Sequence, residues 1–168
     1  MIRAFGSKDI PLIECINPQI KKYRIRWDIQ PYFYDDSEEQ SVSFMEEEIL
    51  HKPTLSEVKN IVLKGYNAIV DEAILNGFKW NGMPVWLSTE NQFNYKAAYD
   101  LAFQTNGASL PTVFKFGTTE NPIYYKFDTL DELQDFYIKA MTYINEQLAI
   151  GWAKKDSIDW SEYEKYLK

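Results

Sequence analysis

Apolar and polar residues alternate strictly from Tyr23 to Ile29, which is the period of a β-strand with one buried face. Pro31 is expected to bend or end this strand. The segment from Ser41 to Leu50 predicts a returning strand with Val42 and Phe44 facing inward. Together they predict an antiparallel hairpin, in which the first strand has Tyr23, Ile25, Trp27 and Ile29 on one face and Arg24, Arg26 and Asp28 on the other.

Three later segments carry apolar residues at every third or fourth position, which predicts amphipathic helices. The first runs from Thr54 to about Asn76, the second from about Glu90 to Thr105, and the third begins at Thr129. Each starts with a threonine that precedes a Glu or Gln by three residues, so each can form a capping box. On the second helix, the residues expected to face inward are Phe93, Ala97, Leu101 and Ala102.

Two glycines add local structural information. The Asn81-Gly82 pair, between Phe78 and Met83, predicts a hairpin with a two-residue turn, because these residues accept positive φ angles. Gly65 lies inside the first helix, where it costs about 1 kcal/mol relative to Ala. That cost is more easily tolerated if another element packs closely against the helix at Gly65.

The order of these elements predicts an α+β fold, in which short antiparallel strands and hairpins pack with three amphipathic helices. A second hairpin is expected from Val113 to Phe127. Residues 1–52 are expected to form an N-terminal arm and the first hairpin, with Pro11 and Pro18 limiting regular structure in the arm. Residues 53–168 are expected to form a helix-hairpin-helix-hairpin-helix domain, and the whole chain one continuous globular unit.

Charge and composition disfavour nucleic acid as a partner and a membrane as the location. The 168 residues carry a net charge of -7, so their field repels phosphate backbones and disfavours nucleic acid as a partner. The chain has no window of roughly 18 to 20 apolar residues that would cross a membrane. The single cysteine, Cys15, and the lack of a secretory signal predict synthesis in the cytoplasm of a soluble protein.

The sequence supplies no catalytic, cofactor or metal-binding motif. His51 is the only histidine, and the glycine patterns that bind phosphate or form a nucleophile elbow are missing from the sequence. A calcium site is conceivable in the acidic residues, but a solvated turn and a charged strand edge explain them more simply. These acidic residues are Asp35, Asp36, Glu38, Glu39, Glu46, Glu47 and Glu48.

Aromatic residues make up 16% of the chain and offer an interaction surface. By alternation Trp86 falls opposite the face of Val85 and Leu87, so its ring is the best candidate for exposure. The tail from Ile158 to Lys168 has a period of three to four residues and is expected to dock on its own domain or on a neighbouring subunit. The candidate interaction residues are Trp86, Tyr95, Tyr124, Trp160, Tyr163 and Tyr166.

Several segments resemble an uncharacterised domain of tail-fibre and tail-associated proteins in phages and prophages, including those of gut Bacteroides. The resemblance rests on Phe78-Lys79-Trp80-Asn81-Gly82, on the segment from Val85 to Gln92, on the Thr129-led helix, and on Ile150 to Ile158. The upstream strand around Trp27 and the helix entry from His51 to Leu55 are similar as well. The resemblance implies a protein whose work is contact with other proteins, and it brings no catalytic residues.

The resulting expectation is a non-enzymatic phage or prophage structural protein, associated with the virion or its tail, that acts through assembly with other virion proteins or with itself. It would reside in the cytoplasm of the bacterial host during assembly and then in the virion. One alternative is a carbohydrate-binding module that recognises a host glycan through exposed aromatics such as Trp86. Another is an enzyme that uses a pair of carboxylates, which the sequence cannot select among 25 acidic residues.

Overall fold

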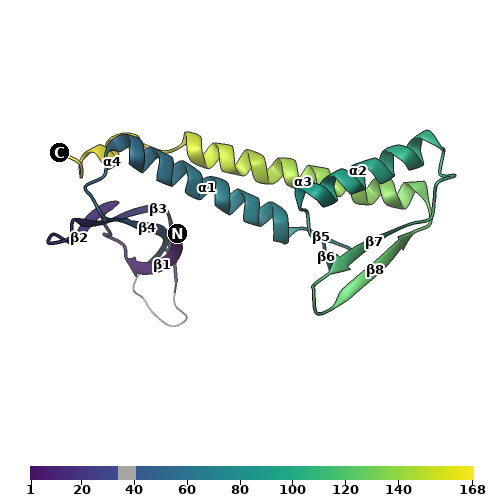
Figure 1. The fold of residues 1–168 in the computed structure, drawn as a ribbon, viewed down its shortest axis with the longest axis horizontal. Helices are drawn as coiled ribbons and strands as arrows, with labels where there is room; N and C mark the ends of the chain where they lie inside the picture. The colour runs from purple at the N-terminus through teal and green to yellow at the C-terminus, as the bar shows by residue number, and fades with distance from the viewer. Residues whose placement is uncertain (34–40) are drawn as a thin grey trace. The chain divides into compact units, whose positions relative to one another are not determined.

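The computed structural model describes residues 1–33 and 41–168, and it confirms the α+β class. The described residues form two compact units, of which unit 1 comprises residues 1–68 and 153–168 and unit 2 comprises residues 69–152. The elements are β1 (Ile2–Ser7), β2 (Ile13–Asn17), β3 (Lys22–Tyr32), β4 (Ser41–Ile49), α1 (Leu55–Gly77), β5 (Lys79–Trp80), β6 (Met83–Pro84), α2 (Thr89–Gln104), β7 (Thr112–Gly117), β8 (Pro122–Phe127), α3 (Leu130–Asp156) and α4 (Trp160–Glu164) (Figure 1).

The unit boundaries fall inside α1 and α3, so each of these helices contributes residues to both units. This division differs from the expected boundary after residue 52. Chain segments that lie far apart in the sequence, residues 1–68 and 153–168, share one hydrophobic core and therefore belong to the same unit.

Unit 1 is built on a four-stranded antiparallel sheet with the strand order β1-β4-β3-β2. The predicted hairpin is its central pair, and the expected polar turn at residues 35–39 lies outside the described residues. The N-terminal segment is more regular than an arm, because it supplies both edge strands. Pro31 does not end β3, since Pro31 is paired with Val42 and the strand continues to Tyr32.

Ile25 and Trp27 face the core of unit 1, as the alternation predicted, and pack with Val58 and Val62 of α1. Gly65 lies directly against the Trp27 ring, where an added Cβ would overlap the indole. The expectation that a neighbour packs closely at this glycine is confirmed. The alternation predicted two faces but not that the face opposite the core would be buried too: Arg26, on that face, is more than nine-tenths buried. Asp28 was expected on the face of Arg26, but the bulge after Trp27 turns its buried carboxylate to Arg3 and Lys154 on the core side.

The C-terminal tail docks on its own unit. The Tyr163 hydroxyl of α4 donates a hydrogen bond of 2.9 Å to the backbone carbonyl of Arg26, and the Tyr163 side chain is buried. Ile158, Trp160 and Leu167 pack against the same core cluster. The tail was expected to dock on its own domain or on a neighbouring subunit, and in the structure it packs on its own unit.

Unit 2 is held together by aromatic rings, and both of its predicted hairpins are present. Asn81 and Gly82 have positive φ angles of 50° and 79°, as the turn between β5 and β6 requires. Helices α2 and α3 cover one side of the β7–β8 hairpin (Figure 1). The core rings Trp80, Phe116, Phe127 and Phe136 have centroids 5.2 to 6.2 Å apart.

The inward face predicted for α2 was wrong for three of its four residues. Phe93, Ala97 and Leu101 are exposed, whereas Ala102 is buried as expected. The core instead receives Tyr95, whose ring lies 4.7 Å from that of Phe114 and 5.0 Å from that of Phe136. Tyr99 joins the same side, because its ring stacks on Tyr137 of α3 at 4.6 Å.

Of the three predicted capping boxes, the structure contains one in full. The first is complete: Glu57 accepts from the Thr54 backbone N–H at 2.8 Å, and the Glu57 N–H donates to the Thr54 hydroxyl at 3.3 Å. The second is replaced by Ser88, whose hydroxyl accepts from the Asn91 N–H at 3.2 Å. In the third, the Thr129 hydroxyl accepts from the Glu132 N–H, but the Glu132 carboxylate accepts from the Tyr125 hydroxyl instead of completing the box.

Candidate functional site

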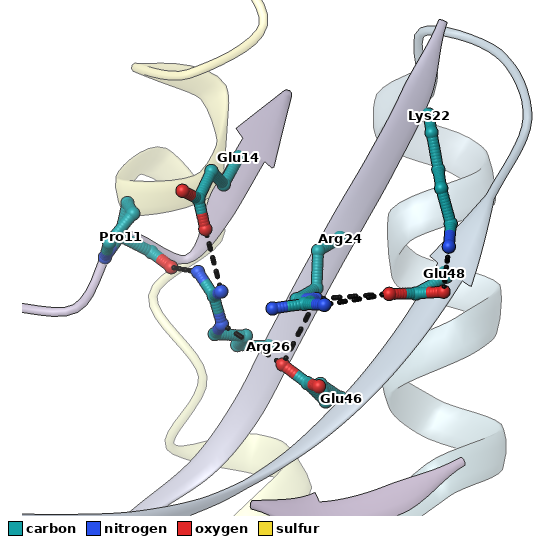
Figure 2. Close-up of polar contacts among 7 residues, drawn as sticks. All are labelled: Pro11, Glu14, Lys22, Arg24, Arg26, Glu46 and Glu48. Atoms are coloured by element: carbon teal, nitrogen blue, oxygen red, sulfur yellow. Dashed lines mark hydrogen bonds and ion pairs between the residues drawn. The ribbon is translucent and has the colours of Figure 1, made fainter. Parts of the chain in front are cut away.

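A ladder of charged side chains crosses the sheet of unit 1 on the face opposite Ile25 and Trp27 (Figure 2). Arg26 is at its centre: its guanidinium donates to Glu14 at 2.6 Å, to Glu46 at 3.3 Å and to the Pro11 carbonyl at 2.9 Å. The same guanidinium lies 5.5 Å from the centroid of the Phe44 ring. A buried arginine with this many partners is fully compensated.

The ladder continues with alternating charge toward the start of β3. Arg24 lies between Glu46 and Glu48, at 3.4 Å and 2.7 Å, and Lys22 reaches Glu48 at 2.5 Å (Figure 2). Hydrogen bonds from Lys22 and Arg24 hold the pKa of the Glu48 carboxyl below its usual value. Because every charge in the ladder has a partner, we interpret it as structural. The acidic residues 35, 36, 38 and 39 of the conceivable calcium site lie outside the described residues.

The six aromatic residues named as an interaction surface do not form one surface. Tyr95 is 2% exposed and Tyr163 is 5% exposed, so both are core residues, and Trp160 is half-buried against the core of unit 1. Burial raises the pKa of Tyr95 to about 12. The other three, Trp86, Tyr124 and Tyr166, are exposed, so the predicted exposure of Trp86 is confirmed.

Trp86 and Tyr95 nevertheless meet at one place, because both line a cleft of about 660 Å³ in unit 2. The cleft is bounded by the segment before α2, by the first turns of α2, by β7 and by the residues that follow β7. Its polar lining residues are Asn76, Asn91, Asn94, Lys115, Thr118, Thr119 and Glu120, and the apolar ones include Pro84, Val113 and Phe114.

Local hydrogen bonds and burial fix the position of Trp86 in the cleft. Its neighbours Val85 and Leu87 are 2% and 1% exposed, so the alternating backbone turns the indole outward, where it is 52% exposed. The side chain of Asn91 donates to the Trp86 carbonyl at 2.9 Å, and that of Gln92 donates to the Leu87 carbonyl at 2.7 Å. The start of α2 therefore holds the backbone of Trp86 in place.

Several polar groups of the cleft are left available. Among the described residues, the side chains of Asn94, Lys115 and Glu120 have no hydrogen-bond or ion-pair partner. The hydroxyl of Tyr95 is also without a partner within the described part of the chain. Glu120 supplies the only carboxylate among the described lining residues, so the cleft does not present a carboxylate pair.

A second feature of unit 2 is the exposed apolar face of α2, formed by Phe93, Ala97 and Leu101. Their spacing of four residues places them in one row along the helix. Phe93 is 71% exposed and Leu101 is 53% exposed. The helical period of the sequence predicted the spacing of this row but not that it faces away from the core. Asn94, Lys115 and Glu120 carry no local sequence signal, because they come together only in the folded chain.

Comparison with protein families gives one match. Residues 57–166, more than half of the chain, match the model of a family described as a domain of unknown function, DUF4376. The chain belongs to the DUF4376 family. No curated protein and no solved structure matches this DUF4376 chain. All residues of the unit 2 cleft and the whole of α2 lie within the matched range, whereas the four strands of unit 1 precede it.

Two absences hold for the described residues of this DUF4376 member. In residues 1–33 and 41–168, no group of three or more His, Cys, Asp and Glu side chains is placed to hold a metal ion. No helix in those same ranges is both long enough and apolar enough to cross a membrane.

Proposed function

We propose that this DUF4376 protein is a non-enzymatic structural protein of a phage or prophage, associated with the virion or its tail, and that it works by assembling with copies of itself and with other virion proteins. The observation that carries the proposal is the exposed row of Phe93, Ala97 and Leu101 on α2. Large apolar side chains gathered on one exposed face mark protein contact sites more often than isolated ones do.

The α2 row is self-complementary, which supports a second copy as its partner. In an antiparallel pair of α2 helices centred on Ala97, Phe93 of each copy meets Leu101 of the other, and the small alanine permits close approach. Lys96 and Asp100, which pair within the helix at 2.6 Å, flank the row and can exchange partners across the pair. Such reciprocal contacts form an isologous interface of the kind that closes a dimer.

The resemblance of the segments around Trp80 and Trp86 to tail-associated proteins supports the virion assignment. Under this proposal the protein occupies the cytoplasm of the bacterial host until assembly, and its net charge of -7 keeps unassembled copies apart from nucleic acid. Peptides of this chain in particles purified from a host that carries the sequence would support this assignment, and their absence from intact particles would contradict it.

Assembly is tested by the solution mass, measured by light scattering over a range of concentrations and at two salt levels. We expect a closed oligomer for the natural chain and a monomer for the variant Phe93→Ser with Leu101→Ser. The matched control is Ile138→Ser with Ile150→Ser, since both residues are about half exposed and lie on α3. A natural chain that stays monomeric at all concentrations would overturn self-assembly through α2.

A further inference from the structure

The unit 2 cleft combines an outward-facing tryptophan with polar side chains that have no partner in the described chain. Trp86 forms part of one wall, and its backbone is fixed by the hydrogen bond from Asn91. Because the backbone of Trp86 is already ordered, ligand binding need not order it, so the contact area of the indole contributes more fully to affinity.

The indole favours a flat ligand surface that carries C–H groups. One face of a pyranose ring presents such C–H groups, which are attracted to the negative face of an aromatic ring and exclude water from it. The hydroxyls at the edge of the same ring then need hydrogen-bond partners. A saccharide therefore requires an aromatic surface with amide or hydroxyl groups beside it.

The polar side chains of the cleft meet that requirement. Asn94 offers one acceptor oxygen and two donor hydrogens, and it makes no hydrogen bond with the described residues. Thr119 is exposed in the lining and carries a hydroxyl that can both donate and accept. Groups that both donate and accept match sugar hydroxyls, which do the same.

The charges of the cleft favour a neutral ligand. Lys115 and Glu120 contribute one positive and one negative charge to the lining, so the described lining residues carry no net charge. The whole chain carries a net charge of -7, which repels anions such as nucleotides and sulfated or sialylated glycans. A cleft of about 660 Å³ falls in the ordinary size range of small-molecule sites.

We propose that the unit 2 cleft binds a neutral saccharide, with the Trp86 indole stacked on one face of a pyranose ring and Asn94 hydrogen-bonded to its hydroxyls. This site is separate from the α2 row used for assembly. Phe93 and Leu101 are not among its described lining residues.

The test begins with an array of neutral oligosaccharides ending in glucose, galactose, mannose or N-acetylglucosamine, together with sialylated and sulfated glycans and with nucleotides. The best ligand is then titrated by calorimetry. We expect a neutral oligosaccharide to bind, Trp86→Ala to weaken its binding at least tenfold, and Asn94→Ala to weaken it several-fold. Both side chains are exposed, so unchanged melting curves are expected for both variants.

The chain offers matched controls. Trp152 is 56% exposed, close to the 52% of Trp86, and is not among the described lining residues, so Trp152→Ala should leave affinity unchanged. Asn145, exposed on α3, serves in the same way for Asn94. The proposal is overturned if no neutral oligosaccharide binds at millimolar concentration, if an anionic ligand binds best, or if Trp86→Ala binds like the natural chain.

Failure of this proposal can be distinguished from failure of the assembly proposal. The variant Phe93→Ser with Leu101→Ser should lose the oligomer and keep saccharide affinity per chain. Trp86→Ala should do the reverse. Loss of both properties in either variant, with melting unchanged, would mean that the cleft and the α2 row are one site and would overturn their separation.

Discussion

The ammonium of Lys154 lies 3.0 Å from the Asp28 carboxylate, although 126 residues separate the two in the sequence. Asp28 is at a bulge in β3, with a positive φ of 51°, and its carboxylate is 3% exposed. Arg3 of β1 supplies the second cation at 2.5 Å. The carboxylate therefore ties an edge strand and the end of α3 to the centre of the sheet.

Removing this buried charge should destabilise unit 1 and change its response to acid. Burial of Asp28 raises its pKa, but hydrogen bonds from Arg3 and Lys154 outweigh burial and the net pKa is lowered. A carboxyl with a lower pKa in the folded state contributes stability above its unfolded pKa of about 3.9, and that contribution is lost as the pH falls. We expect Asp28→Asn to cost about 1 to 3 kcal/mol at pH 7.

The measurement is chemical denaturation at pH 7 and at pH 3. The natural chain and Asp28→Asn should differ most at pH 7 and differ less at pH 3, because part of the contribution is lost once the pH falls below the unfolded pKa. Asp71→Asn serves as the control, because Asp71 is exposed on α1. An equal difference at both pH values would contradict the role given to the Asp28 charge.

Gly65→Ala should destabilise the protein, although alanine is the better helix former. Helix propensity alone would stabilise such a variant by about 1 kcal/mol. The Trp27 indole occupies the position of the new methyl group, and overpacking of this kind costs about 1 to 3 kcal/mol. Thermal and denaturant unfolding of the variant will give the sign, and a gain in stability would mean that Trp27 does not contact Gly65 this closely.

The two residues at the start of α2 should respond differently to substitution. Ser88→Ala removes the hydroxyl that accepts from the Asn91 N–H and should cost about 1 kcal/mol. Thr89 is exposed and its side chain caps nothing in the described chain, so Thr89→Ala should change stability by less than about 0.5 kcal/mol. Denaturant unfolding measures the stability of both variants. A larger loss for Thr89→Ala than for Ser88→Ala would mean that Thr89 caps the helix, as the sequence predicted.

Local sequence patterns predicted the elements whose structure is determined by residues close together in the sequence. Strict alternation predicted β3, the Asn81-Gly82 pair predicted the turn after β5, and the Thr54 and Glu57 pair predicted the start of α1. At the start of α2, serine and threonine are adjacent, so two caps one residue apart were available. Which of Ser88 and Thr89 caps α2 depends on where the first turn of the helix begins, and in the structure the cap is Ser88.

Features that depend on distant contacts were beyond the sequence. Two apolar rows run along α2, and both have helical spacing. The row with Tyr95 faces the core because Phe114 and Phe136, from β7 and α3, accept its ring. The cleft likewise depends on distant contacts, because Asn94 and Lys115 in its lining come from separate elements. In unit 1, β1 is a strand because it pairs with β4.

Arg26 and Glu46 should contribute to stability as a coupled pair. Both side chains are almost fully buried and lie 3.3 Å apart, so removing one leaves the other without its buried partner. We expect Arg26→Met to cost about 3 kcal/mol, because the nearly buried Glu46 carboxylate loses the buried guanidinium and keeps only Arg24 as a cationic partner. Substituting both residues, as Arg26→Met with Glu46→Gln, should cost less than the sum of the single changes, by about 1 to 3 kcal/mol.

Denaturant unfolding of the natural chain, the two single variants and the double variant gives this coupling energy. Lys22 is the control, since it is partly exposed at the end of the ladder, and Lys22→Met should cost less than about 1 kcal/mol. Strictly additive losses would mean that Arg26 and Glu46 act independently. In that case the bonds from Arg26 to Glu14 and to the Pro11 carbonyl, and not its pair with Glu46, would explain why an arginine is buried in the sheet.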